Sequence, residues 1–167
     1  MIVFDASTLI LIAKMEALDT FLGAVGLVVA IPAEVEKESC AVKKSFDALM
    51  IQKALDESRI RVIAVKDKRL VSKLQVDFGL GKGEAESIAL ALAKKARMIG
   101  IDDKNGINAC KLLGIVFTTA IGILIRMREK ELLTVKQALV KLAALGKHGR
   151  YKQSILEDAR RKLEATA

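Results

Sequence analysis

The sequence is poor in the residues on which most metal-dependent and covalent catalysis depends. It has one histidine, His148, and two cysteines, Cys40 and Cys110, which lie far apart and show no metal-type spacing. A histidine-rich zinc site is therefore excluded, and a Ser/His/Asp triad would rest on one histidine in the polar turn that we predict at 146–150. We interpret the two cysteines as buried free thiols rather than as a disulfide.

Proline, aromatic residues and long apolar runs are scarce as well. With a single proline, 4% aromatic residues and no low-complexity tract, the chain is expected to fold around Leu, Ile, Val and Ala. The longest nearly uncharged runs, 21–33 and 112–125, contain Gly, Pro or Thr and are too short to span a membrane. Asp5 follows Met1 closely where a secretory signal would have a basic segment, so we expect a cytoplasmic protein without a membrane segment.

Short apolar strands and amphipathic helices are predicted to alternate along a chain whose 167 residues suit one domain. The predicted strands are 2–4, 27–31, 60–65, 98–101 and 115–117. The predicted helices are 9–22 with a break near 18–20, a helix after Pro32, 44–58, 67–78, 84–96, 104–113, 119–131, 134–145 and 151–165. This alternation predicts an α/β fold, a three-layer α/β/α sandwich with a mostly parallel central sheet and a C-terminal helical extension.

Acidic residues recur where these elements meet. They are Asp5 after the first strand, Glu34 or Glu38 after the second, Glu84 after a glycine-rich segment, and Asp102 with Asp103 after the fourth strand. Because the carboxyl ends of parallel strands share one edge of a sheet, we expect these acids to lie close together. Several carboxylates without histidine are what Mg²⁺ requires, and such an ion can activate water against a phosphodiester.

Each acid also has a purely structural explanation. Asp5 and Asp102 can cap helices, and Glu34 and Glu84 fall in first helical turns, where negative charge is favoured. Taken together, however, several carboxylates at one edge would repel one another unless a cation joined them. The group therefore favours a metal site more strongly than any of its members does.

Positive charge is concentrated in the last quarter of the chain. The net charge of +8 divides into +2 for residues 1–125, with 17 basic and 15 acidic residues, and +6 for residues 126–167, with 11 basic and 5 acidic. A basic face beside an acidic cluster suits a polyanion whose reacting phosphate sits on a carboxylate-bound metal. A solvated helix face is the alternative reading of the same lysines and arginines.

The sequence resembles the PIN-domain ribonucleases, which include toxins of the VapBC toxin–antitoxin type. The resemblance rests on VFDAS around Asp5, IPAEVEKE with Val35 and Glu38, GKGEAESIALALA around Glu84, and IGIDDKNG around Asp102, 18 residues after Glu84. It extends through TTAIGILIRMREKELL, so that residues 1–133 correspond to a PIN-like nuclease domain. Residues 134–167 would then be a helical extension packed on the same domain.

The resemblance implies a Mg²⁺- or Mn²⁺-dependent endoribonuclease. Asp5, Glu38, Glu84 and Asp102 would bind the metal and carry catalysis, with Ser7 as a supporting contact. Asp103 would be an alternative ligand, or would support the ligands without binding the metal. Glu38 is preferred to Glu34 because it fits the Val-x-x-Glu pattern that follows the proline of this family. RNA is the implied substrate, and an antitoxin protein and a homodimer are the other partners considered.

Two alternatives are open at this point. The chain could be a PIN-like module that binds RNA or protein without cutting. It could also be a phosphatase of the haloacid dehalogenase type, in which Asp5 would form an aspartyl phosphate. Two observations argue against the phosphatase. Ser7 stands where the Asp-x-Asp motif of that family has its second acid, and Glu84 would have no role in the reaction.

Overall fold

The computed structural model describes residues 1–41 and 45–165, and a parallel sheet lies at its centre. The strands are β1 (Ile2–Phe4), β2 (Val29–Ile31), β3 (Ile60–Val62), β4 (Met98–Gly100) and β5 (Phe117–Thr118), in the order β3-β2-β1-β4-β5. Every neighbouring pair is parallel. The buried central strands are short apolar runs, as expected for strands that are covered on both faces.

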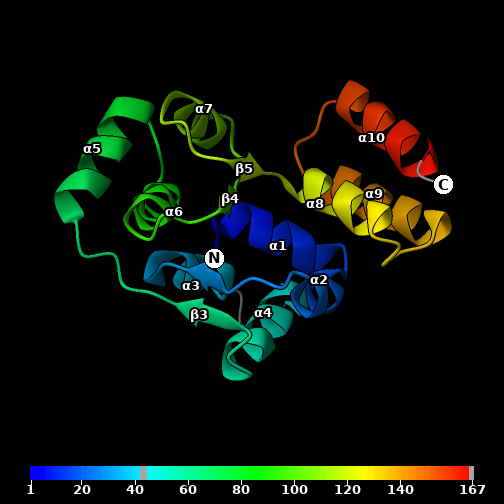
Figure 1. Ribbon diagram of the computed structural model, residues 1–167, viewed down its shortest axis with the longest axis horizontal. Coiled ribbons are helices and arrows are strands. Elements are labelled where there is room, and N and C mark those ends of the chain that lie inside the picture. The colour runs from blue at the N-terminus through cyan, green and yellow to red at the C-terminus, as the bar shows by residue number, and fades with distance from the viewer. Residues whose placement is uncertain (42–44, 166–167) are drawn as a thin grey trace.

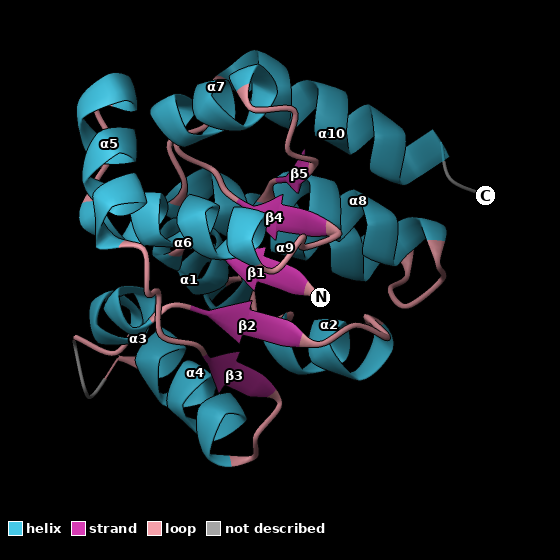
Figure 2. Cartoon of the chain, turned by 60° about the vertical axis from the view of Figure 1, so that its left-hand side comes forward, coloured by secondary structure: helices cyan, strands magenta, loops and turns pink. Residues whose placement is uncertain are grey.

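Helices cover both faces of this sheet (Figures 1 and 2). They are α1 (Ala6–Lys14), α2 (Leu18–Ala24), α3 (Ala33–Ser39), α4 (Phe46–Asp56), α5 (Lys68–Phe78), α6 (Lys82–Ala93), α7 (Lys104–Leu112), α8 (Ala120–Glu129), α9 (Val135–His148) and α10 (Gln153–Ala165). The predicted three-layer α/β/α sandwich with a parallel sheet is thereby confirmed.

The core is divided by the sheet into two clusters. Along β1, Ile2 and Phe4 belong to one cluster and Val3 to the other, as the alternation of side chains in a strand requires. The first cluster also takes in Leu145 from α9 and Leu163 from α10, which are 1% and 0% exposed. The C-terminal helices thus pack on the same core as α1 and α8.

The structure differs from the sequence-based boundaries mainly at element ends. β3 ends at Val62 rather than at residue 65, and β5 lies at Phe117–Thr118 rather than at 115–117. The turn predicted at 146–150 is wrong in its first half, because α9 continues through Gly146 to His148. The predicted helix start at residue 44 lies outside the described residues, and α4 begins at Phe46 with Ser45 as its N-cap.

Other predictions concern thiols, apolar segments and membrane spans. Both cysteines are free, with Cys110 buried and Cys40 half-buried. Leu9, Ile12 and Leu124 are fully buried in the first core cluster. Throughout the described part of the chain, no helix combines the length and apolarity needed to cross a membrane.

The strand order places β1 beside β4, with Phe4 opposite Gly100. The chain winds from β1 through β2 to β3 on one side and from β4 to β5 on the other, so the order of strands reverses between β1 and β4. Ligands of open α/β sheets bind at such a reversal, outside the carboxyl ends of the strands. Asp5 follows β1 and Asp102 follows β4 at this position.

Candidate active site at the carboxyl edge of the sheet

Asp5 is the most deeply buried acid at this edge. It is 1% exposed, and its carboxylate accepts hydrogen bonds from Thr8 N (2.9 Å) and Ser7 Oγ (2.6 Å). It is itself the N-cap of α1, as predicted for a carboxylate at this position. Burial raises the pKa of Asp5 to about 7, although the hydrogen bonds from Ser7 and Thr8 act in the opposite direction.

Asp102 lies in the segment between β4 and α7 and is held by three donors. Its Oδ2 accepts from Thr8 Oγ1 (2.8 Å) and from the backbone N of Ala120 (2.9 Å), and its Oδ1 accepts from the Tyr151 hydroxyl. Burial raises the pKa of Asp102, and all three hydrogen bonds partly offset that effect. The side chain is thereby fixed by α1, by the start of α8 and by the link between α9 and α10.

The structure brings Asp5 and Asp102 together through Thr8. The backbone N of Thr8 donates to Asp5 while its hydroxyl donates to Asp102. The charge of Asp102 contributes to the raised pKa of Asp5. The charge of Asp102 therefore disfavours the charged form of the buried Asp5, which is an arrangement that a bound cation relieves.

Glu38 lies on the last turn of α3 and faces the start of α6. A Cβ on Gly83 would come within 2.5 Å of Glu38 Oε2, so the absence of a side chain at Gly83 leaves room for this carboxylate. Burial is the largest cause of the raised pKa of Glu38, followed by the charges of Glu34, Glu84 and Glu86; a backbone hydrogen bond from Gly83 lowers it.

Glu34, the alternative to Glu38, is already engaged by cations. Its Oε2 lies 2.6 Å from Lys82 Nζ and 3.6 Å from Lys37 Nζ. The hydrogen bond with Lys82 is the main cause of the lowered pKa of Glu34. A carboxylate that is neutralised by lysines is a poorer candidate for a metal than Glu38, which lies against a glycine.

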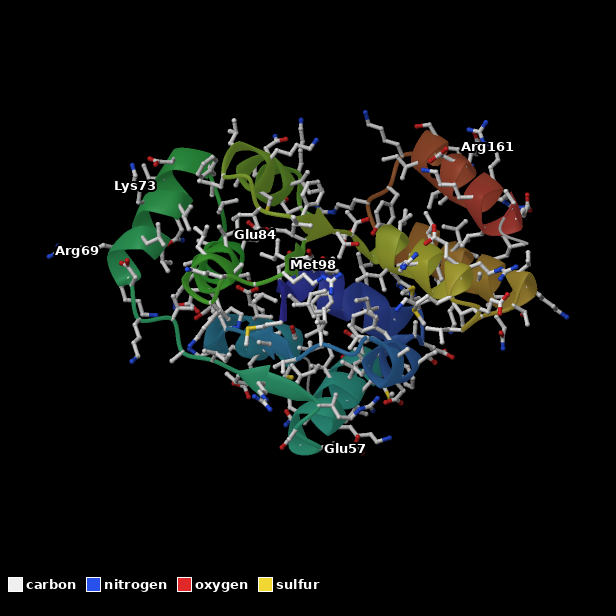
Figure 3. All side chains as sticks on the ribbon, viewed as in Figure 1. Glu57, Arg69, Lys73, Glu84, Met98 and Arg161 are labelled. Atoms are coloured by element: carbon white, nitrogen blue, oxygen red, sulfur yellow. The ribbon has the colours of Figure 1, made fainter. Side chains whose placement is uncertain are left out.

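Glu84 lies in the first turn of α6 (Figure 3). Its Oε2 accepts from Gly81 N at 2.9 Å, so the side chain folds back onto the N-terminus of its own helix. Burial and the charge of Asp103 raise the pKa of Glu84. Asp103 caps α7 by accepting from Asn105 N (2.7 Å) and Gly106 N (3.0 Å).

The predicted acids therefore line one edge of the sheet in pairs. Asp5 pairs with Asp102 through Thr8, while electrostatic interactions join Glu38 to Glu84 and Glu84 to Asp103. Within residues 1–41 and 45–165, no three His, Cys, Asp or Glu side chains are arranged as a group that could hold a metal ion. Asp5 and Asp102 share the donor Thr8, whereas the charges that raise the pKa of Glu38 and Glu84 are those of other acids: Glu34, Glu84 and Glu86 for Glu38, and Asp103 for Glu84.

Three contributors to this region escaped the reasoning from sequence. Thr8 bridges the aspartates, and it could have been found because it lies on the first turn of the helix that Asp5 caps. Glu86, two residues after Glu84 and on a different face of the helix, is 3% exposed and lies 3.0 Å from Lys68 Nζ. Tyr151 had no local signal, since only the tertiary fold brings it to Asp102.

Comparison with known proteins assigns the family. A profile of the family described as PIN domain, DUF3368, matches residues 1–165, which is nearly the whole chain and includes the C-terminal helices. No curated protein and no solved structure gives a significant match. The match to the profile agrees with the parallel α/β sheet of the structure. The chain therefore belongs to the PIN-domain family and has a nuclease-type fold.

Proposed function

We propose that this protein is a Mg²⁺- or Mn²⁺-dependent endoribonuclease. The observation that carries the proposal is the pair of Asp5 and Asp102, which are linked by Thr8 at the edge where α/β folds bind ligands. Family membership supports phosphodiester hydrolysis as the reaction class. It lends no support to the haloacid dehalogenase-type phosphatase.

The chemistry of the donor set fits a hard divalent cation. Carboxylate oxygens are the ligands that Mg²⁺ and Mn²⁺ prefer, and Mg²⁺ usually takes only one or two direct carboxylates together with waters and substrate phosphate. Asp5 and Asp102 would hold the ion, with Glu38 and Glu84 completing the site and Asp103 and Ser7 in support. When bound, such an ion supplies an activated water and stabilises charge on the phosphate oxygens.

The protein's own groups would prepare the site for this ion. The two donors on Asp5 and the three on Asp102 fix both carboxylates before any ligand arrives. Preorganised groups need no reorganisation at the moment of reaction, which is a large part of the catalytic benefit. Ser7 and Thr8 thereby act as residues that orient the two aspartates.

Basic side chains are placed to attract RNA. Lys104 is exposed at the start of α7, beside Asp103, whereas Lys82 at the start of α6 is paired with Glu34. Arg69 and Lys73 on α5, and Arg161 on α10, project outward at opposite ends of the molecule (Figure 3). With a net charge of +8, the chain would bind a polyanion in a salt-dependent manner.

Metal removal tests the proposal directly. RNA cleavage by the purified chain is expected to require Mg²⁺ or Mn²⁺, to stop when EDTA is added and to return when excess metal is restored. Denaturing gels with labelled RNA of mixed sequence measure the effect, and parallel wells with single-stranded DNA test the choice of substrate. Cleavage that persists after complete chelation would contradict the proposal.

Substitution of Glu34 and Glu38, two of the three glutamates of α3, separates the candidates for the second acid. Glu38→Gln is expected to lower the cleavage rate by about 10- to 100-fold or more, because a metal-binding charge is lost. Glu34→Gln on the same helix is the matched control and is expected to stay within about threefold of the wild type. Initial rates at saturating metal provide the comparison, and the reverse order of effects would move the site by one helical turn.

A non-catalytic binding module is the second candidate. It is favoured by the fact that the described residues contain no arrangement of three acids suited to a metal. RNA binding that shifts mobility in gels, without cleavage at any metal concentration, would support this reading. A toxin role with an antitoxin partner, a homodimer and a cytoplasmic location are further proposals, and size-exclusion chromatography tests the dimer.

A further inference from the structure

Tyr151 reaches the candidate site from a part of the chain that is remote in sequence. It lies in the link between α9 and α10, and its hydroxyl donates to Oδ1 of Asp102. It is the only tyrosine of the chain, which has no tryptophan. One phenol therefore connects the C-terminal helices to a carboxylate of the site, and it can be observed spectroscopically without interference.

Gly149 makes room for the Tyr151 ring. A Cβ at Gly149 would lie 2.4 Å from Cε2 and 2.7 Å from Cδ2 of the ring. The backbone of Gly149 has a φ of −92°, which any residue can adopt, so glycine is required by the close approach of the ring and of the backbone oxygen of Leu145, which would lie 2.9 Å from a Cβ. The ring also packs against the first core cluster. Packing thus places the phenol independently of its hydrogen bond.

The helices that carry Tyr151 are themselves anchored. Lys141 Nζ of α9 donates to the backbone oxygens of Met15 (3.1 Å) and Glu16 (2.8 Å) just after α1. Leu145 and Leu163 are buried in the core that α1 and α8 share. The hydroxyl is consequently held against the site by a packed element, as a precisely oriented donor must be.

A count of hydrogen bonds on Asp102 shows what this hydroxyl does. Each carboxylate oxygen offers two lone pairs. Oδ2 accepts from Thr8 Oγ1 and Ala120 N, which uses both. Oδ1 accepts from Tyr151, which leaves one lone pair for another partner. Without the Tyr151 hydroxyl, Oδ1 of Asp102 would lose the hydrogen bond that helps to fix the orientation of the carboxylate.

We infer that Tyr151 is a positioning residue for a divalent cation at this site, in that it orients Asp102 and leaves one lone pair of Oδ1 for the ion. The inference rests on the proposed function, because it concerns the same metal. Groups that hydrogen-bond to metal ligands typically contribute about 10- to 100-fold to metal affinity or activity. The C-terminal helices are therefore part of the site, although they supply none of its acids.

Calorimetric titration of the full chain with Mn²⁺ tests this role. Tyr151→Phe keeps the ring and removes only the hydroxyl, so the fold is expected to survive while the Mn²⁺ dissociation constant rises by about 10- to 100-fold. His148→Gln, an exposed change near the end of α9, is the matched control and is expected to bind Mn²⁺ like the wild type. Thermal melts in EDTA check that all three proteins are folded.

A second variant keeps the phenol and moves it. The Cβ of Gly149→Ala would meet both the ring and the backbone oxygen of Leu145, so the variant is expected to displace the ring and to weaken Mn²⁺ binding as Tyr151→Phe does. Tyrosine emission reports the movement, because it depends on whether the phenol donates to a carboxylate. Addition of Mg²⁺ is expected to change this emission in the wild type and to leave it unchanged in Gly149→Ala.

The outcomes separate this inference from the proposed function. Equal Mn²⁺ affinity of wild type and Tyr151→Phe would overturn the positioning role while the metal site stands. Tighter binding by Tyr151→Phe would also overturn it, since the hydroxyl would then compete with the ion. Failure of the wild type to bind Mn²⁺ would overturn the metal site itself and the role of Tyr151 with it.

Discussion

Asp102→Asn is expected to reduce RNA cleavage by more than about 100-fold. This loss is larger than the loss usually seen when a group that hydrogen-bonds to a metal ligand is removed. Asparagine keeps the size of the side chain but removes the negative charge. Its amide can also present only one acceptor oxygen to the three donors that converge on Asp102. The variant thus loses both attraction for the cation and the orientation of the donor.

The fold of this variant is expected to remain intact. The carboxylate of Asp102 is destabilised by burial, so its removal also relieves an electrostatic cost. Near-wild-type circular dichroism and a Tm within a few degrees would show this. Asp158→Asn, an exposed position of α10 paired with Lys162, is the control and is expected to retain full cleavage. Full nuclease activity in a folded Asp102→Asn variant would contradict the proposal that Asp102 binds the catalytic metal.

The layers of the fold could be predicted because they follow from local patterns. Runs such as Ile2–Phe4 and Val29–Ile31 are apolar throughout, and the intervening segments have helical periodicity. Once strands and helices alternate, the rules of parallel sheets place Asp5 and Asp102 at one edge. The sheet edge at which Asp5 and Asp102 meet could therefore be predicted from the sequence.

The contacts within the site could not be predicted, because they depend on packing between distant segments. Tyr151 is 49 residues from Asp102, and Thr8 is 94 residues from it. No sequence pattern predicts that Glu86 pairs with Lys68, which lies 18 residues away. Helix ends were also uncertain: Gly146 predicts a turn locally, but packing carries α9 past it.

The burial of Asp5 has a consequence for stability that is independent of any activity assay. Burial raises the pKa of Asp5 to about 7 in the folded protein from its ordinary value of 3.8, so the folded state holds this proton at pH values where the unfolded state has lost it. Stability rises with pH only where the unfolded state binds more protons, and here the reverse holds. Asp5 therefore makes the metal-free protein less stable as pH rises from about 4 to about 7.

Asp5→Asn is expected to remove this loss. Asparagine caps helices about as well as aspartate, so its oxygen can still accept from Thr8 N. At about 1.4 kcal/mol per pKa unit, metal-free Asp5→Asn should be more stable than the wild type by a few kcal/mol at pH 8, with a smaller difference at pH 5. Urea unfolding in EDTA at the two pH values measures this difference.

The same pair of proteins then links stability to the proposed metal. Saturating Mg²⁺ at pH 8 should stabilise the wild type by binding only its folded state, and should have much less effect on Asp5→Asn. Asp67→Asn, which changes the exposed N-cap of α5, serves as the matched control. Its stability is expected to follow that of the wild type both in EDTA and in Mg²⁺. Identical pH profiles for the wild type and Asp5→Asn in EDTA would contradict the burial of a costly carboxylate at position 5. A reversal of their order on adding Mg²⁺ would show that this cost to the metal-free fold is relieved by the cation.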